Sequence, residues 1–398
     1  MASVSSKGKH TMLETFRNYN GKRLNAHVLG LVVSLSGLFV VAPMLPEIID
    51  YFGITARQAG LSLSFMWACN AVAQYPGGRC ADSLSTSTVL LASQVLLISG
   101  FIILSLASLY PIFVLGLGLI GVGYGIFELA GFVLVQTNFD KYRGRAFGIR
   151  DAAVNLGSAM SAVLAAAVLG TFIWRAAFVP IAALLAMISL LTHRLNREEY
   201  AISRVSLDVR AVCSRLFGDK DTYAVLVVMS VSMFLWQGSA SFLPTYLQTA
   251  KSFTAFEATL AFSSIFLIGV LVTPLAGMLS DAWSAIGTGV AAMGCGIVGL
   301  SALVIFDSPL GIATGLATYA IAITAIWPVM YVYLGDVLST STIGGDLGVF
   351  RTVYFAIGSL GPAYIGTAAT RLGYATAFTT LTVCFCLAGI SLVWLWWR

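Results

Sequence analysis

Twelve long apolar runs follow one another along the chain, and each is long enough to cross a lipid bilayer as a helix. Of the 398 residues, 58% are hydrophobic and only 10% are charged, whereas roughly a quarter of a soluble domain is charged. A water-soluble fold of this length has no interior large enough to hide so much apolar surface. The sequence therefore predicts an all-α polytopic membrane protein with twelve transmembrane helices. The predicted spans are residues 25–49, 56–77, 88–108, 111–136, 145–169, 175–193, 222–246, 254–276, 284–306, 309–335, 346–369 and 373–397.

Lysine and arginine gather on one side of the predicted membrane, the side that also holds both termini. Only Arg57, Arg175, Lys251 and Arg371 fall on the opposite side, so 18 of the 22 basic residues share the first side. Basic residues are enriched in cytoplasmic loops. We therefore expect a multi-pass protein of the cell membrane with both termini in the cytoplasm. The net charge of +5 then follows from topology, and nothing in the sequence points to nucleic acid.

The chain divides into two halves of similar length. We predict a cytoplasmic tail at residues 1–24, a six-helix bundle at 25–193, a cytoplasmic central loop at 194–221 and a second six-helix bundle at 222–398. Landmarks recur between the halves at offsets of 198 to 201 residues, among them Pro46 with Pro244, Asp82 with Asp281, and Arg150 with Arg351. Secondary transporters are commonly built from repeated halves, with the substrate between them. The repeat thus favours two pseudo-symmetric six-helix bundles around one site.

Two loops carry a glycine followed four residues later by an aspartate. Residues 78–85 read GRCADSLS between spans 2 and 3, and residues 277–283 read GMLSDAW between spans 8 and 9. Together with YRGRAFG at 142–148 and WRAAF at 174–178, these motifs resemble those of the major facilitator superfamily. The resemblance covers the whole chain. The first loop departs from the family pattern, because serine and threonine replace the basic residues that usually follow the aspartate.

The resemblance implies a cytoplasmic latch that closes the cavity on that side. Its glycines would let helices approach closely, and its carboxylates would accept backbone N–H groups at a helix N-terminus of the other half. By analogy with the family, Asp82 would face span 11 and Asp281 would face span 5. The alternative is that both aspartates are exposed turn residues. The predicted latch residues are Gly78, Asp82, Arg150, Gly277, Asp281 and Arg351.

Polar residues inside the spans are the candidates for a substrate site, because such groups are costly in lipid. In the resembled family, spans 1, 4, 7 and 10 line the central cavity. Glu128 on span 4 is the clearest candidate, either as a proton-coupling or substrate residue or as a structural partner of Arg150. The predicted cavity residues are Ser34, Asn70, Gln74, Tyr124, Glu128, Asn155, Trp236, Gln237, Tyr319, Trp327 and Tyr354.

Arg150 and Arg351 also form a symmetric pair that suits an anion, since guanidinium binds carboxylate or phosphate in a fork. Both lie within two turns of a predicted cytoplasmic helix end. That depth favours the latch over an anion clamp.

The motifs expected of other function classes are missing from the sequence. There is no P-loop, nucleophile elbow or metal-ligand spacing, so we predict neither an enzyme nor a cofactor or metal. We predict a monomeric secondary active transporter that moves a small organic solute by alternating access. An anionic metabolite as substrate and a symported coupling proton both remain open. A drug or metabolite efflux antiporter is the alternative, and a non-transporting sensor or scaffold, with the central loop as its output surface, is the alternative of a different class.

Overall fold

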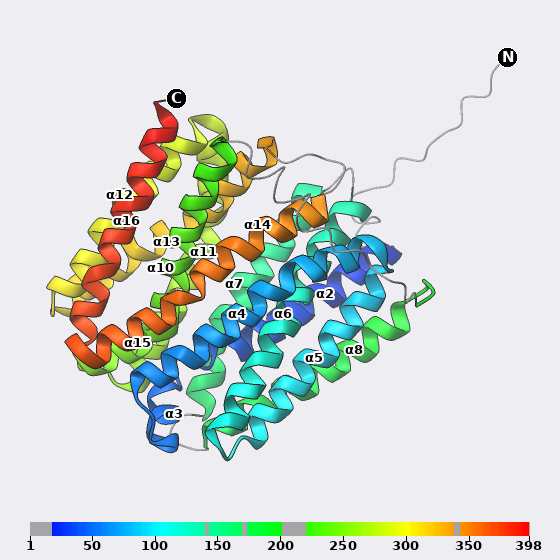
Figure 1. Ribbon diagram of the computed structural model, residues 1–398, viewed down its shortest axis with the longest axis horizontal. Coiled ribbons are helices and arrows are strands. Elements are labelled where there is room, and N and C mark those ends of the chain that lie inside the picture. The colour runs from blue at the N-terminus through cyan, green and yellow to red at the C-terminus, as the bar shows by residue number, and fades with distance from the viewer. Residues whose placement is uncertain (1–17, 140–142, 169–172, 201–219, 338–342, 398) are drawn as a thin grey trace.

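The structure is a computed structural model that describes residues 18–139, 143–168, 173–200, 220–337 and 343–397. Within these ranges the chain is helical almost throughout and contains no strand (Figure 1). The elements are α2 (Tyr19–Phe39), α3 (Leu45–Phe52), α4 (Ala56–Ser83), α5 (Thr86–Leu106), α6 (Tyr110–Asn138), α7 (Arg143–Val168), the 3-10 helix η1 (Trp174–Ala177), α8 (Phe178–Leu195), α10 (Lys220–Ala250), α11 (Ala255–Ala282), α12 (Ala285–Ile305), α13 (Pro309–Val337), α14 (Ile343–Gly358), α15 (Leu360–Leu372) and α16 (Tyr374–Trp396).

These helices match the twelve predicted spans. Nine of the described helical segments are long and apolar enough to cross a membrane on length and composition alone. The other three spans are α2 with α3, the more polar α4, and α14 with α15. Spans 1 and 11 are therefore each built from two helices, which the hydropathy of the sequence did not predict.

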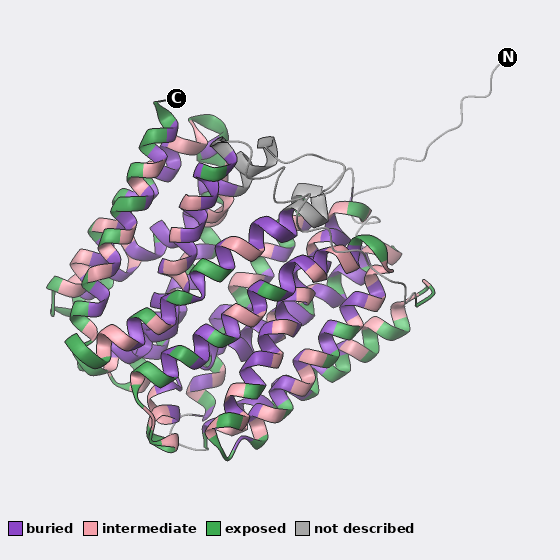
Figure 2. Cartoon of the chain, viewed as in Figure 1, coloured by how far each residue is buried: buried purple, intermediate pink, exposed green. Residues whose placement is uncertain are grey.

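The outer faces of the helices are apolar, as expected where lipid is the solvent. Figure 2 shows buried residues along the faces where helices meet and exposed residues along the outer faces. Leu106, Leu271 and Val298 are among the large apolar side chains left exposed. A soluble protein rarely leaves a continuous apolar surface of this kind uncovered.

Helix starts repeat between the halves as the sequence landmarks do. Thr55 caps α4, its hydroxyl accepting the Gln58 N–H, and Thr254 caps α11, its hydroxyl accepting the Glu257 N–H, each at 3.2 Å. In both cases the side chain at the third helical position bonds back to the backbone of the cap, which completes a capping box. Ser85 and Ser284 likewise cap α5 and α12.

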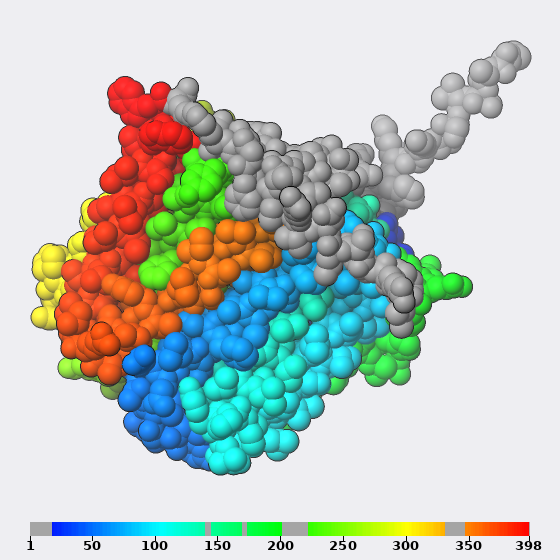
Figure 3. All heavy atoms as spheres, viewed as in Figure 1, coloured from blue at the N-terminus to red at the C-terminus, as the bar shows by residue number. Residues whose placement is uncertain are grey.

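The two halves meet along two pairs of helices. The helix α4 packs along α14 and α15, and α7 packs along α11. The first pair crosses one face of the molecule in Figure 1, and Figure 3 shows its spheres in contact along most of its length. In this pair the Ala363 N–H donates to the Ser64 hydroxyl at 2.8 Å, and in the second the Ser263 hydroxyl donates to the Ala159 carbonyl at 3.0 Å.

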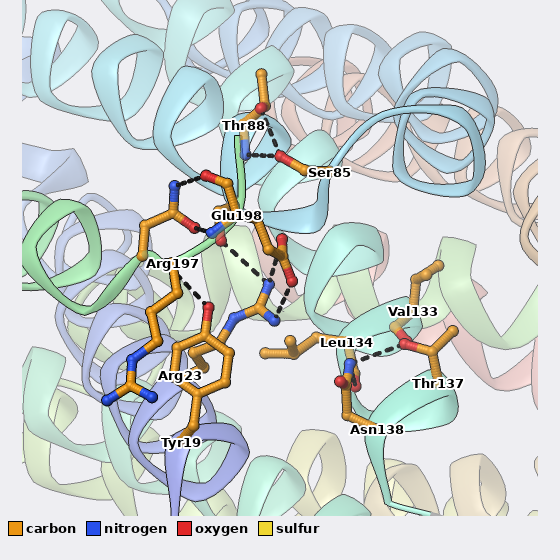
Figure 4. A network of polar contacts seen from close by, with 12 residues as sticks. Tyr19, Arg23, Ser85, Thr88, Val133, Leu134, Thr137, Asn138, Arg197 and Glu198 are labelled. Atoms are coloured by element: carbon orange, nitrogen blue, oxygen red, sulfur yellow. Dashed lines mark hydrogen bonds and ion pairs between the residues drawn. The ribbon is translucent and has the colours of Figure 1, made fainter. Parts of the chain in front are cut away.

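The start of the central loop is bound to the first bundle (Figure 4). The guanidinium group of Arg23 on α2 donates to both carboxylate oxygens of Glu198, at 2.7 and 3.2 Å, and to the Ser87 hydroxyl at 3.1 Å. The Arg197 N–H donates to the Tyr19 hydroxyl at 3.1 Å. Residues 1–17 and 201–219, which make up most of the predicted tail and central loop, lie outside the described residues, and the predicted domain division stays a prediction.

Candidate functional site

A cavity of about 190 Å³ lies between the two halves. Four helices of each half contribute residues to its wall, so each bundle forms one side of the cavity. The lining residues on the first half are Leu35, Phe39, Trp67, Tyr124, Glu128, Arg150, Asp151, Val154, Asn155 and Ser158. On the second half they are Met233, Trp236, Phe266, Thr273, Ile323, Thr324, Trp327, Pro328, Arg351, Tyr354 and Phe355.

Three ionised side chains meet in the wall of this cavity. Glu128 on α6 accepts a hydrogen bond from Nη2 of Arg150 on α7, at 3.1 Å from its Oε1. Its other carboxylate oxygen, Oε2, accepts a hydrogen bond from Nη2 of Arg351 on α14. Because Arg351 belongs to the second half and the other two residues to the first, this ion triad bridges the two bundles.

Two amide side chains of α4, Gln74 and Asn70, form a hydrogen-bonded chain that orients Arg351. Its Nε donates to Oε1 of Gln74 at 3.1 Å, and Nε2 of Gln74 donates to Oδ1 of Asn70 at 3.1 Å. The guanidinium carbon also lies 5.2 Å from the centroid of the Phe355 ring, a cation–π distance. These contacts hold the fork of Arg351 in one orientation toward Glu128.

The triad carries an unbalanced positive charge. The side chains of Arg150, Arg351 and Glu128 are only 6%, 2% and 11% exposed, whereas Asp151, which accepts from Arg150 Nη1 at 3.0 Å, is 48% exposed. Asp151 also lines the cavity, and its partly solvated carboxylate offsets only part of the charge of Arg150. Among the described residues, two buried cations thus face one buried anion. In addition, the buried Nε of Arg150 has no hydrogen-bond partner. The site thus retains a positive charge and a donor for one more acceptor.

An aromatic wall, formed by Phe39, Trp67, Trp236 and Phe266, closes another part of the cavity. The Phe39 ring lies 6.5 Å from Trp67, 6.0 Å from Trp236 and 5.3 Å from Phe266, between ring centroids. Such spacings are typical of favourable ring pairs. Since Trp236 and Phe266 come from the second half, this wall also joins the bundles.

The predicted cavity residues fall into three groups. Six of them line the cavity: Tyr124, Glu128, Asn155, Trp236, Trp327 and Tyr354. Two more, Asn70 and Gln74, form the hydrogen-bonded chain that contacts Arg351. The lining does not include Ser34, Gln237 or Tyr319. Ser34 bonds to the Leu31 carbonyl of its own helix, and Tyr319 bonds to Ser239 within the second bundle.

The predicted latch residues do not share one place. Arg150 and Arg351 line the central cavity, although their position in the sequence favoured the cytoplasmic rim. Asp82 and Asp281 are exposed in the last turns of α4 and α11. Gly277 has open space where a Cβ would point, so no close helix approach explains that glycine here. The latch function itself stays a prediction.

Thirteen of the 21 lining residues were not predicted as site residues from the sequence, among them Phe39, Trp67, Phe266 and Asp151. Phenylalanine within an apolar span carries no signal that separates a cavity-facing ring from a lipid-facing one. Trp67 shares α4 with Asn70 and Gln74, and this shared helix is the only sequence signal for it.

Known proteins that resemble the chain are transporters. A family model described as "Major Facilitator Superfamily" matches residues 28–362. The "Probable nitrate transporter NarT" of Staphylococcus carnosus (strain TM300) is 24% identical over 266 residues, which cover 67% of this chain and 68% of that relative.

Solved structures share the twelve-helix fold and confirm the predicted fold class. A bacterial homologue of the human lysosomal transporter Spinster, in an inward-facing and occupied conformation, superposes with a TM-score of 0.78 at 17% identity and covers 94% of this chain and 96% of that one. A D-xylose-proton symporter superposes with a TM-score of 0.76 at 15% identity, with coverage of 95% and 98%.

Proposed function

Because the chain belongs to the major facilitator superfamily, we propose that it is a secondary transporter that carries a small anion through the central cavity by alternating access. Two six-helix bundles would rock around the cavity and expose it to each side in turn. The observation that carries the proposal is the ion triad, in which two buried arginines, one from each half, share the single buried carboxylate of Glu128.

The charge of the triad favours an anionic substrate. An uncompensated buried cation is costly in a medium of low dielectric constant, and an anion in the cavity would remove that cost. Guanidinium groups bind carboxylates and other oxyanions in a fork with two hydrogen bonds. The unpartnered Nε of Arg150 would supply a further donor to such a ligand.

The charge of the site alone is compatible with many anions, and the known relatives narrow the class of substrate. The Staphylococcus carnosus relative is described as a probable nitrate transporter, and nitrate is a small planar oxyanion. This likeness supports an anion as the cargo, whereas the identity of 24% is too low to carry nitrate itself over to this chain.

Glu128 would couple a proton to the anion. Its carboxylate occupies the donors that an anion would need. A proton on Glu128 would weaken its hold on both guanidinium groups, so the substrate could take its place. We therefore propose proton–anion symport as the mode of coupling.

The proposed orientation places both termini in the cytoplasm, and its support is the bias of 18 of 22 basic residues toward that side. A single chain supplies both walls of the cavity. We accordingly propose that the transporter works as a monomer in the cell membrane.

Anion binding to the purified protein tests this proposal. Nitrate, acetate and benzoate would be added as sodium salts, and the melting temperature would be recorded against equal concentrations of sodium gluconate, benzamide and benzylammonium chloride. A ligand that binds only the folded protein stabilises it by mass action. We expect stabilisation by at least one of the three test anions and none by the neutral or cationic compounds.

Charge-removing variants identify the residues responsible. Arg150→Gln and Arg351→Gln should each weaken anion binding about ten-fold or more, because a charge-assisted hydrogen bond is lost. Arg57→Gln is the matched control, since Arg57 is exposed at the start of α4. Stabilisation by the benzylammonium cation alone, or wild-type affinity in both cavity variants, would overturn the proposal.

A further inference from the structure

The cavity has two chemically different parts, and together they define a substrate class narrower than "anion". We propose, on the basis of the anion transport proposed above, that the substrate is an amphiphilic carboxylate with a flat, aromatic-sized apolar body. Its carboxylate binds Arg150 and Arg351, and its body packs against the aromatic wall.

The aromatic wall and the ion triad are one ring apart. Trp67 of the wall lies 6.3 Å from Phe355, between ring centroids, and the guanidinium carbon of Arg351 lies 5.2 Å from the Phe355 centroid. All three residues line the same cavity. A carboxylate held by Arg351 therefore has its attached carbon skeleton next to aromatic surface.

The size of the cavity fits a ring with a carboxylate. Its volume is about 190 Å³, and an apolar cavity of about 150 Å³ is known to take up benzene. Nitrate has only four heavy atoms and would leave most of the aromatic wall without a contact partner. Apolar surface facing a void loses its dispersion contacts, so a ligand that covers the wall binds more tightly.

Aromatic walls also suit cations, through the negative faces of their rings. The charges of this cavity argue against a cationic substrate. Among the described residues, Arg150 and Arg351 are buried and outnumber the one buried carboxylate, Glu128, while Asp151, which pairs with Arg150 in the cavity wall, is 48% exposed. A cation would add to an existing excess of positive charge, whereas an anion removes it.

A matched ligand series tests the inference on the purified full-length protein. Isothermal titration would compare benzoate, acetate and nitrate, with benzamide as the neutral isostere of benzoate. We expect benzoate to bind about ten-fold or more tightly than acetate or nitrate, because a ring adds apolar contact area. Benzamide should bind at least about ten-fold more weakly than benzoate, because it lacks the charge that the arginines bind.

Variants of the wall separate ring packing from charge. Trp236, which is only partly buried and lines the cavity, would be replaced in Trp236→Leu and in the conservative Trp236→Phe. Trp236→Leu should weaken benzoate binding about five-fold, the effect expected for one lost ring contact, and leave acetate binding unchanged. Trp236→Phe should recover most of the loss. Trp394→Leu, at a 50% exposed tryptophan of α16, is the matched control and should bind benzoate as the wild type does.

The possible failures are distinguishable. Acetate or nitrate binding as tightly as benzoate would overturn the amphiphilic class and leave anion transport standing. Equal affinity for benzamide and benzoate would overturn the assignment of the carboxylate to the arginines. If none of the anions binds, the proposed function fails together with this inference.

Discussion

Glu128 is the residue on which the charge balance of the cavity depends. It is the only buried acid in contact with both Arg150 and Arg351, among the residues that the structure describes. Its two oxygens each accept from a different arginine, so the carboxylate lies between two buried cations and offsets one of their two charges. An anion that enters the cavity would compete with it for these donors and find one further donor in Nε of Arg150.

Glu128→Gln should uncouple anion transport from proton movement. Glutamine keeps the shape of glutamate but carries no charge and takes up no proton. In anion-free buffer the two arginines lose their counter-ion, and the free energy of unfolding should fall by about 3 kcal/mol. In proteoliposomes, pH-gradient-driven accumulation of benzoate should disappear, while exchange of internal for external benzoate continues.

The control for this variant is Asp50→Asn, at an exposed aspartate of α3. It should accumulate benzoate as the wild type does. An unchanged pH dependence of uptake in Glu128→Gln would exclude Glu128 as the coupling residue.

At this scale the sequence identified the charged residues but not their arrangement. Glu128 and Arg150 are 22 residues apart on neighbouring spans, and their pairing was one of the alternatives left open. Arg351 lies 223 residues from Glu128, and no local pattern indicates that the two meet. Both arginines lie near the starts of α7 and α14 and yet line the cavity, and only the packing of both bundles determines this.

At the scale of elements, the first turn of α2 depends on the segment that follows α8. Arg23 is only 6% exposed, and its partner Glu198 is 37% exposed. Asn196 holds the backbone around Glu198, since its side chain donates to the Glu198 carbonyl and accepts the Glu198 N–H. The start of the central loop is thereby fixed to the first bundle.

Glu198→Gln should loosen this attachment. A buried guanidinium would lose its charged acceptor, and we expect the free energy of unfolding to fall by about 1 kcal/mol, a modest loss because Glu198 is partly solvated. Thermal unfolding in detergent measures the change. Glu199→Gln, at the exposed neighbouring glutamate, should unfold at the wild-type temperature; a loss of the same size there would mean that the contact with Arg23 is not the cause.

The extents of the spans were predictable from hydropathy, but their interruptions were not. Residues 40–44 stay apolar where span 1 leaves the helix before α3 begins. Pro43 lies inside this break and Pro46 follows it, whereas α10 continues through Pro244, the counterpart of Pro46 in the repeat. The counterpart of Pro43 is Ser241, so the additional proline distinguishes the two halves, because proline in a helix interior removes a backbone hydrogen bond.

For the whole molecule, the contact between α4 and α15 holds the two halves together at one end of the cavity. A Cβ on Gly60 would collide with the Pro362 carbonyl, so the backbones there are close. The Ser64 hydroxyl accepts from the Ala363 N–H at 2.8 Å. In the predicted orientation this end faces outward, so the contact has to separate before the cavity can open to the outside.

A disulfide across this contact should stop transport. In a background without the six native cysteines, the pair Ser64→Cys and Ala363→Cys brings two thiols close enough to be oxidised. Uptake of benzoate into proteoliposomes should fall to background after oxidation and return after reduction. Ser64→Cys alone should keep its uptake under the same oxidant, and full activity of the oxidised pair would mean that α4 and α15 do not separate during the cycle.

The overall architecture was the most predictable level, because twelve apolar runs and a repeat of about 200 residues are long-range features of the sequence itself. Which helices line the cavity was given only by resemblance to the family, as spans 1, 4, 7 and 10, and the structure adds residues of α4, α7, α11 and α14 to the lining. Neither the long-range sequence features nor the family resemblance predicted the aromatic wall, since the sequence does not determine the direction in which Phe39 or Phe266 points.

The polar side of α4 has a consequence for how the protein is made. Gln74 completes its hydrogen bonding with Arg351, which is 277 residues further along the chain and is synthesised much later. Until then, the membrane holds a weakly hydrophobic span in which the Gln74 amide donates to Asn70 but its oxygen lacks the arginine donor. Biogenesis of the first bundle should accordingly depend on an insertase or chaperone that shelters this helix until the second bundle arrives.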